Sequence, residues 1–406
     1  MPPPVIYLDT QDYSRFGDVL RGKAHGITEA LFRDLEKRKQ AGDAIFAVSM
    51  PIFGELLQYD SSFRETSICK AEAVERLCGS WALAFPSRLV AAEIGGAGRQ
   101  CGLLPEGPDF EILSSDRYWY PNVAAAFENL RAQIHAGISP EIEALGLTSR
   151  KMRRAAKTLA NKIDFAAAAR AAAPQMALKY GLPVEVFIRS IVALLNRTVT
   201  PAQASRLLFG AIAEPVKFVE TYFERIESER TLPAWISGFG RDFEGRLTTF
   251  RETLKPHIHI DSARQHLESL LAEWPTKLAQ VALSMAGDDI SEIAMDAGKL
   301  DSLASDPELV QLVPAAQIVG KILPAYVRQI IGLSGQEAKI ERSFGGDLVH
   351  ALYLPHVDLW RGDRRFAAVV AGALPQYADR LVAKATALPA AIDAWHASKS
   401  RSRSDA

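Results

Sequence analysis

The stretch VIYLDTQDYSRF, residues 5–16, places a short apolar run directly before an acid. Residues 5–8 combine apolar and β-favouring side chains, which predicts a short buried strand that ends at Asp9. One acid at a strand end often does no more than cap a loop. It gains meaning if other acids follow other strands of the same sheet, so the rest of the chain was searched for them.

The first part of the chain alternates between strand and helix patterns. An amphipathic helix is expected at 27–40, and the continuous apolar run at 44–49 is typical of a central parallel strand. Pro51 suits the first turn of a helix that continues through IFGELLQ, and another helix is expected at 70–85. This β-α-β-α order predicts an α/β fold with a parallel sheet flanked by helices.

A similar alternation of helix and strand patterns, with acids at their ends, recurs near the other end of the chain in SFGGDLVHALYLPHVDLWRGDRRF, residues 343–366. Asp347 is a natural N-cap for a helix at 348–354, and a strand is expected at 357–360. Asp363 follows that strand and can cap the next helix.

The residues between these two ends favour helices. From about 100 to 336 we find almost no convincing strand and no fixed repeat period, only Ala- and Leu-rich helical segments separated by Pro, Gly and Ser-Thr clusters. A large helical insertion in an α/β domain costs little, because the entropy of loop closure grows slowly with length. The expected parts are an α/β domain at 1–98, an all-α insertion at 99–336, the second α/β part at 337–396 with a helix at 377–396, and a disordered tail at 397–406.

Four acids would then converge at one edge of one sheet, since parallel sheets carry their functional groups outside the carboxyl ends of the strands. They are Asp9, Glu55, Asp347 and Asp363. Clustered carboxylates repel one another and raise one another's pKa, which a divalent cation would relieve. Oxygen ligands without histidine or cysteine suit Mg²⁺ or Mn²⁺, and such a site can activate a water against a phosphodiester.

At three places the sequence resembles the PIN-domain nucleases. YLDTQ resembles the family's first strand with its acid, AVSMPIFGEL its second strand segment, and DLVHALYLPHVDLWRGDRRF its closing block. The matching residues are Asp9, Thr10, Ser49, Glu55, Asp347, Asp363 and Phe366. The loop before the last acid reads Trp360-Arg361-Gly362, where the family often has Ser or Thr, and the insertion interrupts a domain that is normally continuous. The resemblance therefore implies a divergent, PIN-like member.

The resemblance implies a metal-dependent ribonuclease in which the four acids hold Mg²⁺ or Mn²⁺. Thr10, Ser49 and Asp12 would lie next to these acids and hold them in place without binding the ion themselves. RNA, or another single-stranded nucleic acid, would be the substrate. The alternative is a catalytically degenerate PIN-like scaffold whose helical insertion binds a protein partner.

Two features of the insertion fit a nucleic acid but have ordinary explanations as well. Arg150, Arg154 and Lys157 fall on one face of an expected helix and would contact phosphates in a nuclease, although a solvated surface is the default for such a run. The aromatic run Tyr118-Trp119-Tyr120 could stack on bases, but a loop packed on the core is the simpler expectation.

Composition limits the class of protein. The 406 residues include 47 basic and 48 acidic side chains, a formal net charge of -1, so any nucleic-acid binding must use a local patch. The three cysteines match no zinc or disulfide pattern and favour a reducing compartment. No long apolar run and no signal-peptide pattern occurs, so the expected location is the cytoplasm, without membrane association.

Overall fold

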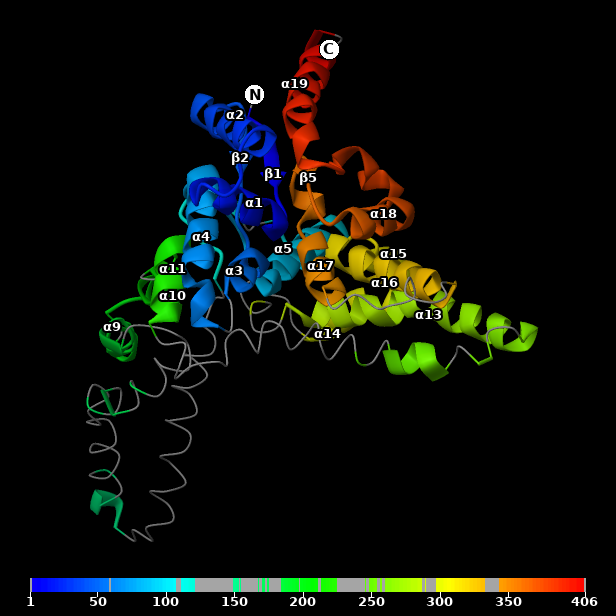
Figure 1. Ribbon diagram of the computed structural model, residues 1–406. Helices are drawn as coiled ribbons and strands as arrows, with labels where there is room; N and C mark the ends of the chain where they lie inside the picture. The colour runs from blue at the N-terminus through cyan, green and yellow to red at the C-terminus, as the bar shows by residue number, and fades with distance from the viewer. Residues whose placement is uncertain are drawn as a thin grey trace.

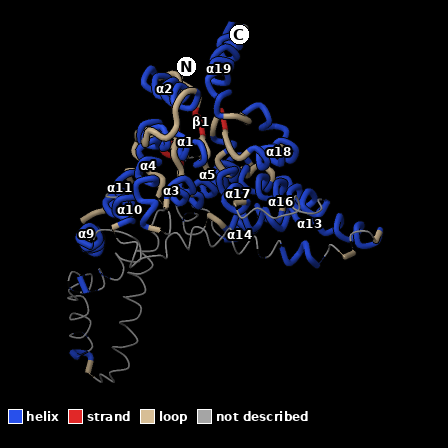
Figure 2. Tube along the Cα trace, viewed as in Figure 1, coloured by secondary structure: helices blue, strands red, loops and turns tan. Residues whose placement is uncertain are grey.

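The computed structural model describes residues 2–57, 60–106, 111–120, 184–196, 198–210, 213–224, 260–286, 297–332 and 343–404, with isolated positions at 149–174, at 245–257 and at 289. Helices dominate these residues, and the strands are few and short (Figures 1 and 2). None of the described helices combines the length and the apolar character needed to cross a membrane.

A three-stranded parallel sheet joins the two ends of the chain. The central strand β1 (Val5–Tyr7) pairs with β2 (Ile45–Phe46) on one side and with β5 (Leu359–Trp360) on the other, in the order β2-β1-β5. The sheet is thus built from both α/β parts, as the sequence predicts. Two isolated parallel bridges, Val48 with Ala82 and Trp360 with Leu381, widen it at its flanks.

The central strand is buried on both faces, which explains its continuous apolar sequence. Ile6, Tyr7 and Leu8 have no exposed surface. The Tyr7 ring stacks on Tyr353, with centroids 5.6 Å apart. At the start of the strand, the Val5 amide donates to one carboxylate oxygen of Asp358 at 2.9 Å. Asp358 therefore holds the strand end and faces away from the edge where Asp9 lies.

Five helices occur in the first α/β part of the chain: α1 (Thr10–Leu20), α2 (Ile27–Ala41), α3 (Met50–Leu56), α4 (Arg64–Cys78) and α5 (Pro86–Gln100). The sequence did not predict α1 and α5. α1 was missed because TQDYSRFGDVL is largely polar, yet it packs tightly on α4: a Cβ at Gly17 would lie 3.0 Å from the Lys70 backbone nitrogen. The helix expected at 70–85 ends at Cys78, where Gly79 at a φ of 60° breaks it.

The helices described in the insertion are α9 (Val184–Leu195), α10 (Pro201–Gly210), α11 (Pro215–Phe223), α13 (Asp261–Ser284), α14 (Ala297–Ser305), α15 (Pro307–Val310) and α16 (Pro314–Gly332). Against expectation, the stretch contains a short strand, β4 (Leu113–Ser114), which pairs antiparallel with β3 (Ala82–Leu83). Two residues carry no period-2 pattern, so β4 could not be predicted.

The insertion docks on the α/β part at two places. α13 runs alongside α16, and α16 contacts α5 and the C-terminal helices (Figure 1). α11 packs on α4, where Trp119 stacks on Phe53 of α3 with centroids 3.6 Å apart and meets Phe218 of α11 edge-on. Tyr118, Trp119 and Tyr120 are buried, so the expectation of a loop packed on the core is confirmed.

The C-terminal block supplies α17 (Phe344–Ala351), α18 (Arg364–Ala373) and α19 (Leu388–Ser404). The helix expected at 377–396 consists of 3₁₀ turns at 375–380 and 385–387 before α19 begins. α19 continues through Ser404, whereas the sequence predicted disorder from 397. Two of its serines bond back to helix carbonyls, Ser398 Oγ to Trp395 O at 2.8 Å and Ser400 Oγ to His396 O at 2.9 Å.

α19 projects beyond the body of the protein at the end where the N-terminus also lies (Figure 1). Arg38 of α2 donates to Asp393 at 2.7 Å, and Trp395 Nε1 donates to Asp358 at 3.1 Å. These contacts fix the first turns of α19 against the start of the sheet.

Candidate functional site

Two of the predicted acids follow neighbouring parallel strands and cap the helices that begin there. Asp9 follows β1 and accepts from the Gln11 amide of α1 at 3.3 Å. Asp363 follows β5 and accepts from the amides of Arg365 and Phe366 in α18 at 2.8 and 3.2 Å. A backbone hydrogen bond of 2.9 Å from Arg361 N to Tyr7 O joins the two strand ends. Asp9 and Asp363 therefore start from the same edge of the sheet.

Glu55 and Asp347 reach that region from helices. Glu55 lies in the last turn of α3, the helix that Ser49 opens after β2. Asp347 lies in the first turn of α17, which packs on α3. The approach is close at Gly346, where a Cβ would lie 3.4 Å from Glu55 Oε1.

A histidine that the sequence analysis did not single out stands among these acids. His350 Nε2 lies 3.2 Å from Glu55 Oε1, and His350 Nδ1 lies 2.5 Å from the Tyr7 hydroxyl. The same hydroxyl lies 2.6 Å from Ser49 Oγ. The His350 side chain is 5% exposed and that of Glu55 is 39% exposed, so the histidine is enclosed while the carboxylate reaches solvent.

The charges of these groups act on one another. Burial raises the pKa of Asp347, and the charges of Glu55 and Asp9 raise it further against that of His350, to about 7. Burial, together with the charge of Glu55, also raises the pKa of Asp9, against His350 and Arg361. Burial acts to lower the pKa of His350, but Glu55 outweighs it and raises the pKa to about 9. Asp9, Glu55 and Asp347 thus share one electrostatic environment, in which His350 is the compensating cation.

The pKa of Glu55 moves in the opposite direction. Burial acts to raise it, but the charge and the hydrogen bond of His350 prevail and hold it below its usual value, with smaller contributions from Thr10 and Lys70. Glu55 is therefore the acid of the group that stays ionised most readily.

The fourth acid, Asp363, accepts hydrogen bonds from backbone amides of its own helix, α18. Within the part of the chain that the structure describes, no three His, Cys, Asp or Glu side chains are grouped closely enough to hold a metal ion. The structure therefore brings Asp9, Glu55 and Asp347 into one electrostatic group, and a four-carboxylate metal site stays a prediction.

The chain matches no family model, curated protein or solved structure. Functional conclusions therefore depend on its own residues and on their arrangement.

The three residues expected to support the acids have different surroundings. Ser49 hydrogen-bonds Tyr7, and Thr10 is buried beside Glu55. Asp12 is fully buried and pairs with Arg361, whose Nε lies 3.5 Å from an Asp12 oxygen. Burial raises the pKa of Asp12 to about 6, although the charge of Arg361 opposes this.

Arg361 stands in the loop where the resemblance would have placed Ser or Thr. It is 4% exposed, and its guanidinium also donates to the Gly362 carbonyl. Gly362 lies against the Trp360 indole, where a Cβ would overlap the ring. The Trp-Arg-Gly sequence thus places a buried cation beneath Asp9.

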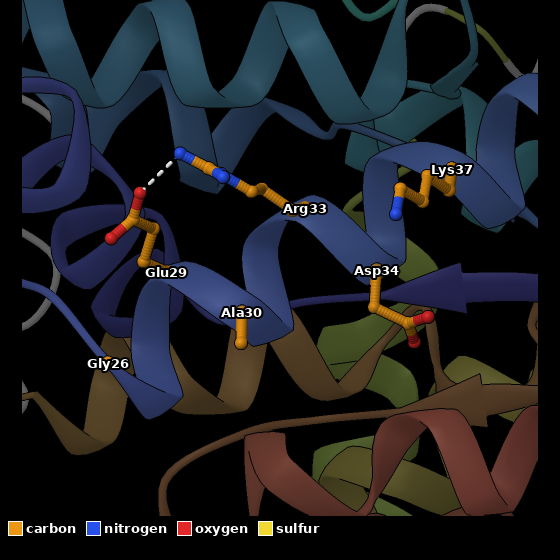
Figure 3. A pocket seen from close by; sticks show the side chains of 6 residues that line it. All are labelled: Gly26, Glu29, Ala30, Arg33, Asp34 and Lys37. Carbon is orange, nitrogen blue, oxygen red and sulfur yellow. Dashed lines mark hydrogen bonds and ion pairs between the residues drawn. The ribbon is translucent and has the colours of Figure 1, made fainter.

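The basic run of the insertion is only partly described. Arg150 and Arg154 are helical and exposed, and Lys157 lies outside the described residues. A surface hollow occurs elsewhere, along α2, where Glu29 and Arg33 form an ion pair (Figure 3). Its lining residues are Gly26, Glu29, Ala30, Arg33, Asp34 and Lys37. They come from a single solvated helix, so this hollow carries no functional conclusion.

Proposed function

We propose that the protein is a divergent PIN-like nuclease that hydrolyses phosphodiester bonds of RNA with the help of Mg²⁺ or Mn²⁺. The observation that supports this best is the raised pKa of Asp347, about 7, which burial causes first and which the charges of Glu55 and Asp9 increase against that of His350. Asp9 caps α1 at the carboxyl end of β1, where parallel sheets bind ligands, and the charge of Glu55 in α3 acts on both Asp9 and Asp347 of α17.

The residues fit a hard divalent cation by their chemistry. They offer carboxylate oxygens, and His350 compensates only part of their charge. Asp9, Glu55 and Asp347 would hold the ion, and Asp363 would join them from the end of β5. When bound, such an ion polarises the phosphate and makes a water more acidic.

The chain's own residues prepare this chemistry. Glu55 presents a carboxylate that is partly open to solvent while His350 holds one of its oxygens. Asp12 is already paired with Arg361, so it stays out of the ligand set and instead fixes that cation below Asp9. Arg150, Arg154 and Lys157 would contact the RNA backbone as positive charges.

The decisive experiment replaces Asp9 and Asp347 together by Asn and measures cleavage of single-stranded RNA and DNA in Mn²⁺. We expect cleavage to disappear while the melting temperature is kept, because Asn retains the shape of both side chains and caps α1 as well as Asp does. Asp34→Asn, at a half-exposed acid of α2 that pairs with Arg38, is the matched control and should cleave like the wild type. Undiminished cleavage by the purified double variant would contradict the proposal.

A second function has one observation in its favour. His350 already neutralises Glu55, and the described residues contain no group ready to hold a metal. This supports a degenerate scaffold whose insertion, docked through α11 and α16, binds a protein partner. Calorimetric titration of the wild type with Mn²⁺ separates the two functions, since the scaffold should show no binding.

A further inference from the structure

A continuous chain of buried hydrogen bonds leads from the core to Glu55. Ser49 Oγ lies 2.6 Å from the Tyr7 hydroxyl, that hydroxyl lies 2.5 Å from His350 Nδ1, and His350 Nε2 lies 3.2 Å from Glu55 Oε1. We call these four residues the Tyr7 relay. Ser49 precedes the first residue of α3 and Glu55 lies in its last turn, so the relay ties both ends of α3 to β1 and α17.

Exposure separates the members of the relay. Tyr7 and Ser49 have no exposed surface, and His350 is 4% exposed with both ring nitrogens engaged. None of these three can touch a substrate. Glu55, with its side chain 39% exposed and one oxygen engaged by the histidine, is the member that can.

Packing alone does not account for so many polar groups. A phenylalanine would fill the space of Tyr7 without a hydroxyl to satisfy, and buried polar groups are costly unless all of them find partners. Tyr353 shows the ordinary case in the same core: it stacks on Tyr7, and its hydroxyl donates to a backbone carbonyl, that of Ala84, at 3.0 Å. The Tyr7 hydroxyl instead meets two side chains, one of which holds Glu55.

We infer that Tyr7 and His350 are positioning residues that hold the Glu55 carboxylate in the orientation needed at the site. This inference rests on the proposed function and adds to it the groups that set the geometry of one acid. Partners of this kind fix the direction of a ligand side chain without touching the metal or the substrate.

The test compares Tyr7→Phe with Tyr353→Phe. Each variant removes one buried hydroxyl and keeps its ring, so both should lose a similar amount of stability. We expect Tyr7→Phe to weaken Mn²⁺ binding about 10-fold and to lower kcat with little change in KM for RNA. Tyr353→Phe should leave both constants unchanged. Equal constants in the two variants would overturn the inference.

A measurement in metal-free protein separates this inference from the proposed function. The ring-nitrogen NMR signals of His350, assigned by their loss in His350→Gln, should move at Nδ1 in Tyr7→Phe and at Nε2 in Glu55→Gln. A wild type that neither binds Mn²⁺ nor cleaves nucleic acid contradicts the proposed function alone. The NMR signals then test the inference about Tyr7 and His350. Shifts at both His350 nitrogens in these two variants support it, and unmoved signals overturn it.

Discussion

Two hydrogen-bonded glutamate–histidine pairs in the described part of the chain have opposite surroundings. In the first, His350 Nε2 lies 3.2 Å from Glu55 Oε1, and in the second, His356 Nε2 lies 2.6 Å from Glu93 Oε1. The Glu93 side chain is 1% exposed, whereas that of Glu55 is 39% exposed. The second oxygen of Glu93 accepts the Ala315 amide at 2.7 Å, and Glu55 has two further acids near it.

The comparison distinguishes a structural pair, in which both carboxylate oxygens have partners, from a pair whose carboxylate is left available for function. Glu93 joins three segments, since it lies on α5 and binds both the first turn of α16 and the histidine beyond α17. All of its oxygens are used, which suits a fixed connection between the insertion and the core. Glu55 keeps an accessible carboxylate in a region with an excess of negative charge, and such frustration is typical of functional sites.

The sharpest test of this division lies at the start of α1, where Asp9 caps the helix and Asp12 stands in its first turn. Asp12→Asn should destabilise the fold by about 3–5 kcal/mol, because it leaves the buried Arg361 without its counter-charge. Asp9→Asn should change the free energy of unfolding by less than about 1 kcal/mol, since Asn caps a helix as well as Asp does. Urea denaturation at neutral pH measures both. Similar losses at the two positions would mean that Asp9 too is structural.

A second test applies one substitution to the two glutamates. Glu93→Gln should cost about 2–3 kcal/mol, because an amide can accept from His356 but then points a donor at the Ala315 amide. Glu55→Gln should cost less than about 1 kcal/mol, because the amide oxygen can still accept from His350 and the amide nitrogen can reach water. Equal midpoints of urea denaturation in the two variants would remove the distinction between the pairs.

The smallest expected effect concerns pH. The pKa of Asp347 is raised from 3.8 to about 7 in the folded protein, so this group favours folding at low pH. That contribution is lost as the pH rises from about 4 to about 7, because the folded state must give up a proton that the unfolded state has already lost. The rise of this pKa from 3.8 to about 7 corresponds to about 4 kcal/mol, of which solvent screening of the half-buried side chain leaves on the order of 1 kcal/mol. Asp347→Asn should therefore be more stable than the wild type above pH 7 by that amount, in metal-free buffer.

Melting temperatures of Asp347→Asn and the wild type across pH 4–8 test this expectation. The difference between the two proteins should increase over that interval, and Asp34→Asn, at a half-exposed acid paired with Arg38, should show no such increase. A constant difference would mean that the pKa of Asp347 is not raised in the folded protein. Addition of Mn²⁺ above pH 7 should raise the melting temperature of the wild type more than that of the variant, because ligand binding stabilises the folded state.

The sequence was most informative where local patterns are strong. The apolar runs at 5–8 and 44–49 each contain a strand of the parallel sheet, because side chains buried on both faces leave a continuous apolar signature. The similar order of acids, helix and strand near the other end correctly indicated a further strand at 357–360, and this strand, β5, pairs with β1.

The sequence did not indicate contacts between residues that lie far apart along the chain. His350 is separated from Glu55 by 295 residues and His356 from Glu93 by 263, and nothing in either local pattern indicates the other member. His350 sits in a predicted helix among apolar neighbours, as many ordinary histidines do. Its one detectable signal was its place three residues after Asp347, on the same face of that helix. Arg361 was noted only as a departure from the family pattern, and its pairing with Asp12 needed the fold.

The order of the strands along the chain also determines at which point of synthesis the sheet edge that carries Asp9 and Asp363 can form. β1 can pair with β2 soon after synthesis starts, but β5 lies more than 350 residues downstream of it. At ordinary translation speeds, on the order of 10 residues per second, the ribosome needs roughly half a minute to supply that last strand. Until then, one side of β1 is open, and Asp347 and Asp363 have not reached their places. The hydrolytic activity that we propose for this edge could therefore arise only after β5 has been made, and the chain would be inactive while the residues before β5 are synthesised.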